Sequence, residues 1–264
     1  MKHVLITGAF GGMGKATTNL FANKGYKVLA LDKRVEEATN ENIIPISADL
    51  TDENSVIKAF EEVKKVTDSL YAIIHFAGIY MLDSLVEMDT KEFEKIFKIN
   101  VNGAYLVNNT FLPLLKSGSK IVITTSELAV LDPLPFTGIY AVTKGALDKY
   151  AYSLRMELQL KDIKVSVLRA GAVATDMIGA STDALDRFCN KTNLYAFSST
   201  KFKDIVEKVE ARKIKAEKLA KKTYKILTKK NPKFAYKINR NPLLLLLNAL
   251  PKSLQCFAIK KILK

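Results

Sequence analysis

The stretch Thr7-Gly8-Ala9-Phe10-Gly11-Gly12-Met13-Gly14 decides how this chain folds. It follows a short apolar run, His3–Ile6, and opens a segment of helical periodicity, Gly14–Lys24. Glycines at a strand-to-helix turn allow a tight bend, and they let a pyrophosphate approach the free N–H groups at the start of the helix. The stretch therefore predicts a nucleotide site at the first junction, although a tight turn alone would also use glycine.

Short apolar runs followed by longer helical segments recur along the chain. Further strands are expected at Lys27–Leu31, Asn42–Ser47, Ala72–Phe76, Lys120–Thr124 and Lys164–Leu168, and helices near Ser55–Val66, Lys91–Leu115 and Ala141–Leu160. Strands that alternate with helices of this length form parallel sheets with right-handed crossovers and helices on both faces. We therefore expect an α/β fold, a doubly wound parallel sheet of the Rossmann type, with its ligand at the carboxyl ends of the strands.

The charge of the chain is unevenly distributed. The 264 residues carry a net charge of +14, yet 19 basic and 4 acidic residues lie from Lys201 onward, so the first 200 residues are nearly neutral. We expect a dinucleotide-binding and catalytic domain over residues 1–200. A basic helical extension over residues 201–264 is expected to pack on that domain or on a partner surface. Because the nucleotide-binding half has no positive excess, a nucleic-acid partner is not expected.

Metal ligands and export signals are both scarce. The two cysteines, Cys189 and Cys256, and the two histidines, His3 and His75, have no metal-ligand spacing, so no metal site is expected. This cysteine usage is typical of a reducing compartment, and we expect a cytoplasmic location. The apolar start is too short for a signal peptide, and no stretch reaches the roughly 18 apolar residues that a membrane-spanning helix needs.

An acidic residue, Asp32, follows the second expected strand. A carboxylate at this point accepts hydrogen bonds from the adenosine ribose hydroxyls and repels a 2′-phosphate, which favours NAD(H) over NADP(H). Lys33 and Arg34 come next and can bind a phosphate instead, so NADP(H) stays open. Asp32 as a plain turn residue is the other interpretation.

Tyr140 and Lys144 lie four residues apart at the start of an expected helix, so their side chains share one face. A neighbouring ammonium lowers the pKa of a tyrosine, which can then exchange a proton during hydride transfer. The same spacing also occurs by chance on surface helices. Ser126 follows the strand Lys120–Thr124, where it can donate to a substrate carbonyl, and Asn100 lies within a long helical pattern without a capping role.

In this order the motifs resemble the short-chain dehydrogenase/reductase family, in its single-domain branch with T-G-x-x-x-G-x-G and Y-x-x-x-K motifs, over about Lys2 to Met177. The resemblance implies an enzyme that interconverts a secondary alcohol and a ketone with NAD(P)(H). Tyr140 would exchange the proton and Ser126 would orient the carbonyl. Lys144 would bind the nicotinamide ribose and tune Tyr140, and Asn100 would support a proton relay through water.

The resemblance also implies which residues meet the cofactor. They are Thr7, Gly8, Phe10, Gly12, Met13, Gly14, Asp32, Asp49, Leu50, Ala77, Gly78, Tyr140, Lys144 and Thr175. Three departures from the family pattern are visible. His75-Phe76 stands where Asn-Asn is usual, and Ala170-Gly171 replaces Pro-Gly. Ser126 lies one residue farther from Tyr140 than is common, which makes Thr125 the alternative; none of these removes a group that the chemistry needs.

In this family the segment after Thr175 covers the substrate, so the resemblance places specificity in about Asp176–Thr200. An apolar lid is expected from Met177, Ile178, Leu185, Phe188, Leu194, Tyr195 and Phe197. A helix from about Phe202 to Lys230 should then pack an apolar face on the domain or on a second subunit. That face comprises Phe202, Ile205, Val206, Val209, Leu219 and Leu227.

The last segment interleaves apolar residues with lysines. Leu243–Leu247 is followed by Phe257, Ile259, Ile262 and Leu263 among Lys260, Lys261 and Lys264. Such a pattern can lie in the headgroup region of an anionic membrane, so peripheral membrane contact is one interpretation; core packing with solvated lysines is the other. Similar tails in members that resemble retinol and hydroxysteroid dehydrogenases hint, by analogy, at a lipophilic substrate.

The sequence thus favours an NAD(H)-linked oxidoreductase acting on a lipophilic alcohol or ketone. An acyl-thioester ketoreductase using NADPH is a second interpretation, because the basic tail could dock an anionic carrier. A cofactor-sensing protein without catalysis is a third, although such a protein has no need of the Asn-Ser-Tyr-Lys set. By analogy with relatives, a homo-oligomer, a dimer or tetramer, is expected through the long helices.

Overall fold

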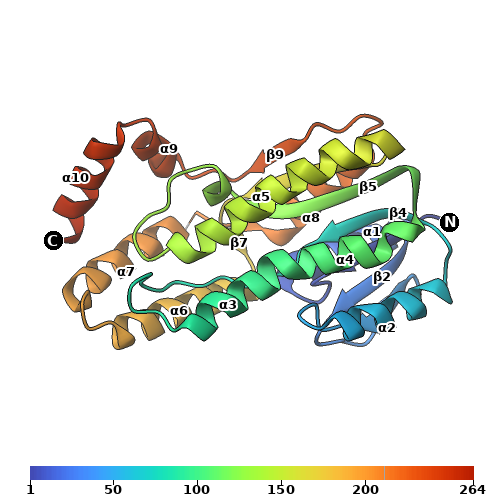
Figure 1. The fold of residues 1–264 in the computed structure, drawn as a ribbon, viewed down its shortest axis with the longest axis horizontal. Coiled ribbons are helices and arrows are strands. Elements are labelled where there is room, and N and C mark those ends of the chain that lie inside the picture. The colour runs from blue at the N-terminus through green and yellow to red at the C-terminus, as the bar shows by residue number, and fades with distance from the viewer. Residues whose placement is uncertain (211) are drawn as a thin grey trace.

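The computed structural model describes the chain except residue 211, and the side chains of residues 176–183 and 207–210 also lie outside the described part. Met177, Ile178 and Val209, expected in the lid and the tail helix, fall among those side chains. The centre of the fold is a seven-stranded parallel sheet with the order β3-β2-β1-β4-β5-β6-β9 (Figure 1). Its strands are β1 (His3–Thr7), β2 (Lys27–Asp32), β3 (Ile43–Ser47), β4 (Leu70–His75), β5 (Leu115–Ser126), β6 (Lys164–Ala170) and β9 (Ala235–Ile238).

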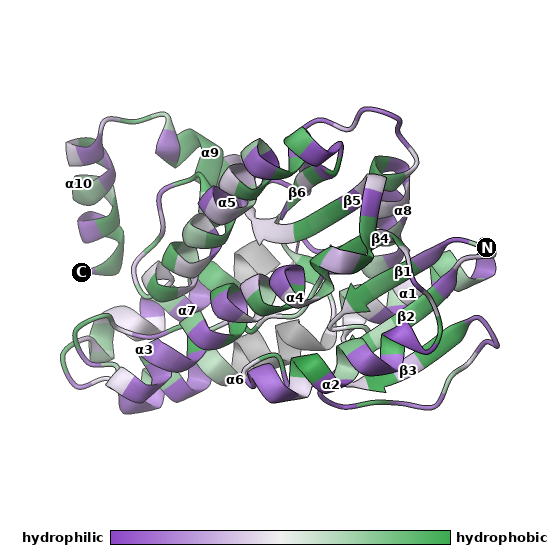
Figure 2. Ribbon diagram, turned by 45° about the vertical axis from the view of Figure 1, so that its right-hand side comes forward, coloured by the Kyte–Doolittle hydropathy of each residue, from purple (hydrophilic) through white to green (hydrophobic). Residues whose placement is uncertain are grey.

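Both faces of the sheet are covered by helices, as the doubly wound prediction requires. Along β1, Leu5 packs toward one layer of helices, whereas Val4 and Ile6 pack toward the other. The first layer consists of α2 (Glu53–Lys64), α4 (Gly103–Phe111) and α5 (Gly138–Leu158), and the second of α1 (Gly12–Asn23) and α8 (Ala216–Leu227). Burial on both faces explains why the strands are almost continuously apolar, as Figure 2 shows.

The strand order reverses between β1 and β4: the chain builds the sheet outward from β1 on one side and from β4 on the other. The carboxyl ends of these two parallel strands lie at the same edge of the sheet. The glycine stretch follows β1, and Ala77 and Gly78 follow β4. In open α/β sheets the crevice beyond such a reversal is where ligands bind. The topology therefore places the glycine motif and the site residues after β4 beside one another.

The expected helix Lys91–Leu115 is made of several parts. α3 (Thr90–Phe97) passes into a π-helical turn, Lys98–Asn102, before α4 begins, and a 3-10 turn, Leu112–Leu114, leads directly into β5. The π turn contains Asn100, whose side chain is drawn aside to bond the backbone of Ile79. Such insertions into a helix are frequent at functional sites.

The prediction of one helix from Phe202 to Lys230 is wrong. α7 (Ala196–Glu210) ends before the two-residue strand β8 (Ile214–Lys215), which pairs with β7 (Val173–Ala174) and precedes α8. The break is held by Asn239, whose side-chain amide donates to the carbonyls of Ala172, at 2.7 Å, and Arg212, at 2.9 Å. Because Asn239 is far from Ala172 and Arg212 in the sequence, no local sequence pattern predicts this break.

Residues after 200 complete the sheet that the first 200 begin. β9, which the sequence did not predict, pairs with β6, and α8 packs against α1, where the rings of Tyr224 and Phe21 lie 5.4 Å apart. The extension is therefore not purely helical, and residue 200 lies inside one packed unit. The other helices are α6 (Asp176–Lys191), α9 (Pro242–Asn248) and α10 (Lys252–Leu263). No helix in the described part of the chain is long and apolar enough to span a membrane.

Replacing Phe21 by alanine tests the union of tail and domain. Phe21 is fully buried between Tyr26 and Tyr224, so the variant should lose about 3–5 kcal/mol of unfolding free energy in urea denaturation. Val66→Ala, at a half-exposed position, should change this free energy by less than about 1 kcal/mol. An equally small loss for Phe21→Ala would contradict the packing of α8 on α1.

Candidate active site

The glycine stretch forms a cradle whose shape depends on missing side chains. Gly8 has a φ of +65°, and a Cβ there would lie 2.6 Å from the amide nitrogen of Ala77. A Cβ on Gly12 would lie 2.5 Å from the Cβ of Thr175, and one on Gly14 would collide with the carbonyl of Gly8. The turn therefore packs against the end of β4 and against the segment before α6 at distances that only glycine permits.

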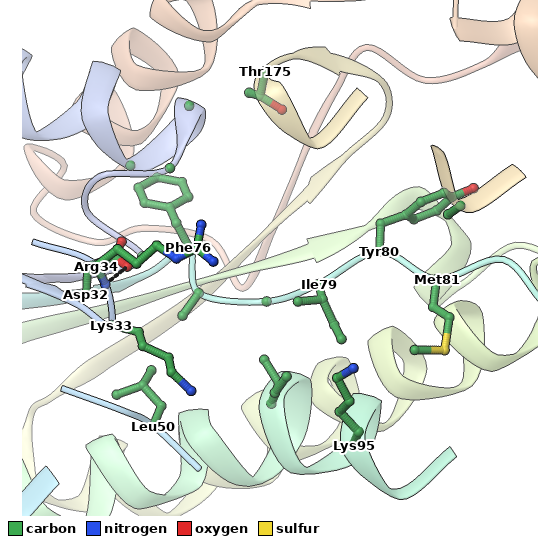
Figure 3. Close-up of a pocket in the computed structure, with 18 of the residues that line it drawn as sticks. Asp32, Lys33, Arg34, Leu50, Phe76, Ile79, Tyr80, Met81, Lys95 and Thr175 are labelled. Carbon is green, nitrogen blue, oxygen red and sulfur yellow. Dashed lines mark hydrogen bonds between the residues drawn. The ribbon is translucent and has the colours of Figure 1, made fainter. Parts of the chain in front are cut away.

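A cavity of about 1040 Å³ opens above this cradle (Figure 3). Most of the residues expected at a cofactor line it, namely Gly8, Phe10, Gly12, Met13, Gly14, Asp32, Asp49, Leu50, Ala77, Gly78 and Thr175. In Figure 3, Asp32, Lys33, Arg34 and Leu50 lie toward one end, and Tyr80 and Met81 toward the other. Thr7 does not line the cavity: it is fully buried, and its hydroxyl accepts a hydrogen bond from the N–H of Ala77 at 3.4 Å.

Charges at one end of the cavity are arranged around two carboxylates. Asp32 accepts hydrogen bonds from the backbone N–H groups of Phe10, at 3.0 Å, and Arg34, at 3.2 Å. Lys33 donates to Asp49 at 2.6 Å, and this bond, helped by Thr51, holds the pKa of Asp49 at about 2. Lys33 is thereby engaged with a carboxylate, whereas the carboxylate of Asp32 faces the cavity with backbone partners only.

Tyr140 lies in a second, smaller cavity of about 200 Å³. Burial raises the pKa of its phenol to about 12, against a smaller opposing effect of its hydrogen bond with Ser126. The Ser126 hydroxyl also accepts from the N–H of Leu128 at 3.2 Å, which fixes its orientation. Thr125 points elsewhere, because its hydroxyl donates to Asp148 at 3.1 Å. Of the two candidates, the structure thus brings Ser126 to Tyr140.

Lys144 lies one helical turn after Tyr140 and is also buried. Burial lowers the pKa of Lys144 to about 8, and its Nζ donates to the carbonyl of Thr124 at 3.3 Å. Desolvation of the phenol outweighs the lowering of the Tyr140 pKa that was expected from Lys144, whose Nζ lies 5.7 Å from the ring centre. The phenol is therefore protonated at neutral pH, as a proton donor to a ketone must be.

Asn100 reaches the site from the π turn. Its amide oxygen accepts from the N–H of Ile79 at 2.8 Å, and its amide nitrogen donates to the carbonyl of Ile79 at 3.0 Å and to the Thr143 hydroxyl at 3.1 Å. A Cβ on Gly78 would lie 3.1 Å from the Asn100 oxygen and 3.5 Å from the Nζ of Lys144. Asn100 therefore holds the chain after β4 close to Lys144.

Several pocket residues escaped the sequence analysis. The hydroxyl of Thr124 is the one buried side-chain polar atom in the described part of the chain without a hydrogen-bond partner, and Thr124 lines the small cavity. Glu127 lines it too; burial raises its pKa, and it accepts from the N–H of Asn241 at 2.8 Å. Tyr80 meets the Tyr140 ring edge-on at 4.7 Å. In the sequence these residues are marked only by their position next to the ends of β4 and β5.

The apolar wall of the small cavity differs from the expected lid. Leu128, Leu134, Ile205, Val206 and Leu244 line the small cavity. Leu194 and Phe197 are exposed and line neither cavity. Leu185 is buried with Leu82, Phe202, Val206 and Leu263, and Phe188 stacks on Phe136 at 4.4 Å. Phe188 also lines the large cavity, together with Ala184, Arg187 and Lys191, so the described part of α6 covers that cavity and not the small one.

His75, the departure in the motif after β4, is fully buried. Its Nε2 lies 2.9 Å from the amide oxygen of Asn108, and Asn108 in turn donates to the Tyr150 hydroxyl at 3.2 Å. Burial lowers the pKa of His75 to about 4, so the ring is neutral at physiological pH. His75 lies behind the cavities and lines neither of them.

Comparison with known proteins identifies the family. Residues 2–186 match the model of the short chain dehydrogenase family. The chain is 31% identical over 192 residues to the NADPH-dependent 1-acyldihydroxyacetone phosphate reductase of Schizosaccharomyces pombe, a match that covers 69% of this chain and 65% of that enzyme. The chain belongs to the short chain dehydrogenase family and is an oxidoreductase of that family.

Solved structures agree with this fold. A short chain dehydrogenase family protein from Francisella tularensis superposes with a TM-score of 0.75 at 24% identity, over 90% of this chain and 97% of that one. The 3-ketoacyl-(acyl-carrier-protein) reductase of Brucella melitensis, complexed with NADH, gives a TM-score of 0.73 at 20% identity, over 90% and 96% of the two chains.

The buried histidine should leave a signature in the pH dependence of stability. The pKa of His75 is 6.5 in the unfolded chain and about 4 in the folded protein, so the unfolded state binds the proton first as the pH falls. The contribution is fully present above pH 6.5, and we expect about 3 kcal/mol of it to be lost between pH 6.5 and 4. His75→Asn should remove this part of the slope in denaturant titrations at several pH values. His3→Asn, at a partly exposed site, should remove much less; equal slopes for wild type and His75→Asn would contradict the burial of a neutral ring.

Proposed function

We propose that this enzyme interconverts a lipophilic secondary alcohol and the corresponding ketone. The observation that carries the proposal is the hydrogen-bonded pair of Ser126 and Tyr140 in a small cavity with apolar walls. That cavity shares Met13, Gly78 and Thr175 with the large cavity above the glycine cradle. A carbonyl held by Ser126 therefore lies where a nicotinamide ring bound in the cradle would reach it.

The residues fit a dinucleotide. The glycine cradle suits the pyrophosphate, Asp32 the adenosine ribose, Asp49 and Leu50 the adenine, and Thr175 the carboxamide. A bound nicotinamide cofactor supplies or accepts the hydride. Ser126 donates a hydrogen bond to the substrate oxygen, and the protonated Tyr140 gives its proton to that oxygen as charge develops on it. In the alcohol-to-ketone direction the same proton returns to Tyr140.

Lys144 supports this transfer by its charge and position. With a pKa of about 8 it is mostly protonated at neutral pH, so it stabilises the phenolate that remains after Tyr140 has given up its proton. We infer that Lys144 also binds the nicotinamide ribose, because its Nζ lies beside Gly78. Asn100 holds the chain at Ile79, and the unpartnered hydroxyl of Thr124 offers a further donor to a ligand.

The apolar wall supports a lipophilic substrate. Leu128, Leu134 and Leu244 surround the space on the substrate side of Tyr140, and burial of alkyl groups there would favour binding. The Schizosaccharomyces pombe relative is named for a reductase of an acylated dihydroxyacetone phosphate, which is a ketone with an acyl chain. We propose a ketone of this lipophilic type for the present chain.

The cofactor we propose is NAD(H). The carboxylate of Asp32 faces the cavity and would repel a 2′-phosphate, and Lys33 is already paired with Asp49. Of the two cations that follow Asp32, Arg34 is then the one left to bind a 2′-phosphate.

A second copy of the chain is the partner that fits α4 and α5. These neighbouring helices expose Tyr105 on α4 and Val142, Tyr152 and Met156 on α5. Apolar side chains gathered on paired helices favour a homo-oligomer. We propose a dimer through this surface or a tetramer built on it.

Tyr140→Phe should abolish turnover and leave cofactor affinity within about threefold of wild type, because the ring stays in place and only the proton donor is lost. Loss of about 100-fold or more in kcat is expected, measured by NADH oxidation with lipophilic ketones. Tyr236→Phe, the same change in β9 at a residue that lines neither cavity, is the matched control and should keep full activity. Full activity of Tyr140→Phe would sink its assignment as proton donor.

Titration with NADH and NADPH, followed by fluorescence, tests the cofactor. Wild type should bind NADH more tightly, and Asp32→Ala should weaken NADH binding by about tenfold while it improves NADPH binding, because the repulsion of the 2′-phosphate is removed. Asp68→Ala, an exposed carboxylate away from the cavity, should change neither affinity. A preference of wild type for NADPH would shift the recognition to Arg34 and favour an acyl-thioester ketoreductase.

A further inference from the structure

The two C-terminal helices carry apolar side chains that the rest of the described structure leaves exposed. In α9, Leu243 and Leu246 are 61% and 67% exposed, and Leu250, two residues after the helix ends, is also exposed. In α10, Leu254 and Phe257 are 51% and 65% exposed. These five residues are called the C-terminal apolar face below.

This face is separate from the packing of the same helices. Leu244 points inward and lines the small cavity, and Leu263 and Ile259 join a buried cluster with Phe202. Leu254 and Phe257 lie on the side of α10 opposite to that cluster, since each is displaced from Ile259 and Leu263 by half a helical turn. Figures 1 and 2 show α9 and α10 at the end of the molecule away from the N-terminus.

The C-terminal segment that carries this face has charged residues of one sign. No acidic residue occurs after Glu217, whereas basic residues continue to Lys264. Lys252 pairs with Asp132, but Lys260, Lys261 and Lys264, which flank Phe257 on α10, form no ion pair within the described part of the chain. Exposed leucines and a phenylalanine ringed by lysines match the interface of an anionic bilayer, which offers acyl chains below phosphate groups.

A second copy of the chain fits this face poorly. In a two-fold symmetric contact the same patch meets itself, so Lys260, Lys261 and Lys264 would face the lysine-rich patch of the other copy, where Asp132 is already paired with Lys252. α9 has 7 residues and α10 has 12, too short to cross a bilayer. We propose that α9 and α10 lie in the headgroup region of an anionic phospholipid membrane, with the C-terminal apolar face buried among the acyl chains.

The same helices are tied to residues 127–132, which follow Ser126 at the end of β5. The N–H of Asn241, at the start of α9, donates to Glu127, and the N–H of Asp132 donates to the side chain of Asn248 at 2.6 Å. Leu244 therefore lines the pocket of Tyr140, while Leu243 and Leu246 face outward one residue before and two residues after it. This step rests on the proposed function: the pocket that takes a lipophilic ketone then lies directly beneath the surface that meets the bilayer.

Vesicle flotation of the full chain tests the docking without any substrate. We expect the protein to bind phosphatidylcholine vesicles that contain about a third of phosphatidylglycerol and to bind pure phosphatidylcholine far more weakly, with binding that falls as salt is added. Leu246→Ser combined with Phe257→Ser should weaken binding by about tenfold or more. The matched control, Ile57→Ser with Leu160→Ser, removes exposed apolar side chains from α2 and from the 3-10 turn after α5 and should bind as wild type does.

Other results separate the alternatives. Equal binding by the Leu246/Phe257 variant and the control, or no binding to anionic vesicles, overturns the proposal. If the wild-type protein is an oligomer that dissociates in the Leu246/Phe257 variant, and neither protein binds vesicles, the face belongs to a contact with a second copy. Activity on a soluble ketone is measured in parallel: vesicle binding without it would refute the proposed function alone, and activity without vesicle binding would refute the docking alone.

Discussion

The close contact between two backbone turns at the centre of the sheet governs the rest of this structure. The turn after β1 lies against the chain after β4, where Gly8 meets Ala77 and the carbonyl of Thr7 accepts the N–H of Phe76 at 3.0 Å. A side chain at Gly8 would push these turns apart. Their approach forms the floor of the large cavity and also fixes Gly78 beside Lys144 and Asn100, so the cradle and the catalytic groups are set by one contact.

The end of β5, with Ser126 as its last residue, is held from two sides. Behind it, Thr125 bonds Asp148, which forms a buried ion pair with Arg169 at 2.7 Å. In front, Glu127 bonds Asn241 of the C-terminal segment. Ser126 stands between these anchors and turns toward Tyr140. Such double support keeps a hydroxyl in the orientation that proton transfer requires.

The local signals predicted the fold and much of the candidate site. Glycine spacing, the period of apolar residues and the order of Asp32, Asn100, Ser126, Tyr140 and Lys144 are all properties of short segments. The structure brings Asp32, Ser126, Tyr140 and Lys144 to two joined cavities, and Asn100 bonds the chain at Ile79 beside them. The strand β9 was missed because it is four residues long and lies within a lysine-rich segment. The break before β8 depends on Asn239, and the pKa of Tyr140 depends on burial. Neither is visible in the residues beside them.

The late position of β9 has a consequence for synthesis. Until residues 235–238 have emerged from the ribosome, β6 is the edge of the sheet, and its unpaired N–H and C=O groups can bond any passing strand. The leucines of α9 are also unpacked at this stage, because Leu244 lines the pocket only after the N–H of Asn241 has bonded Glu127. A nascent chain that has completed every catalytic residue is therefore still open along one side. The nascent chain therefore depends most on chaperones after its catalytic residues have been synthesised and before β9 closes the sheet.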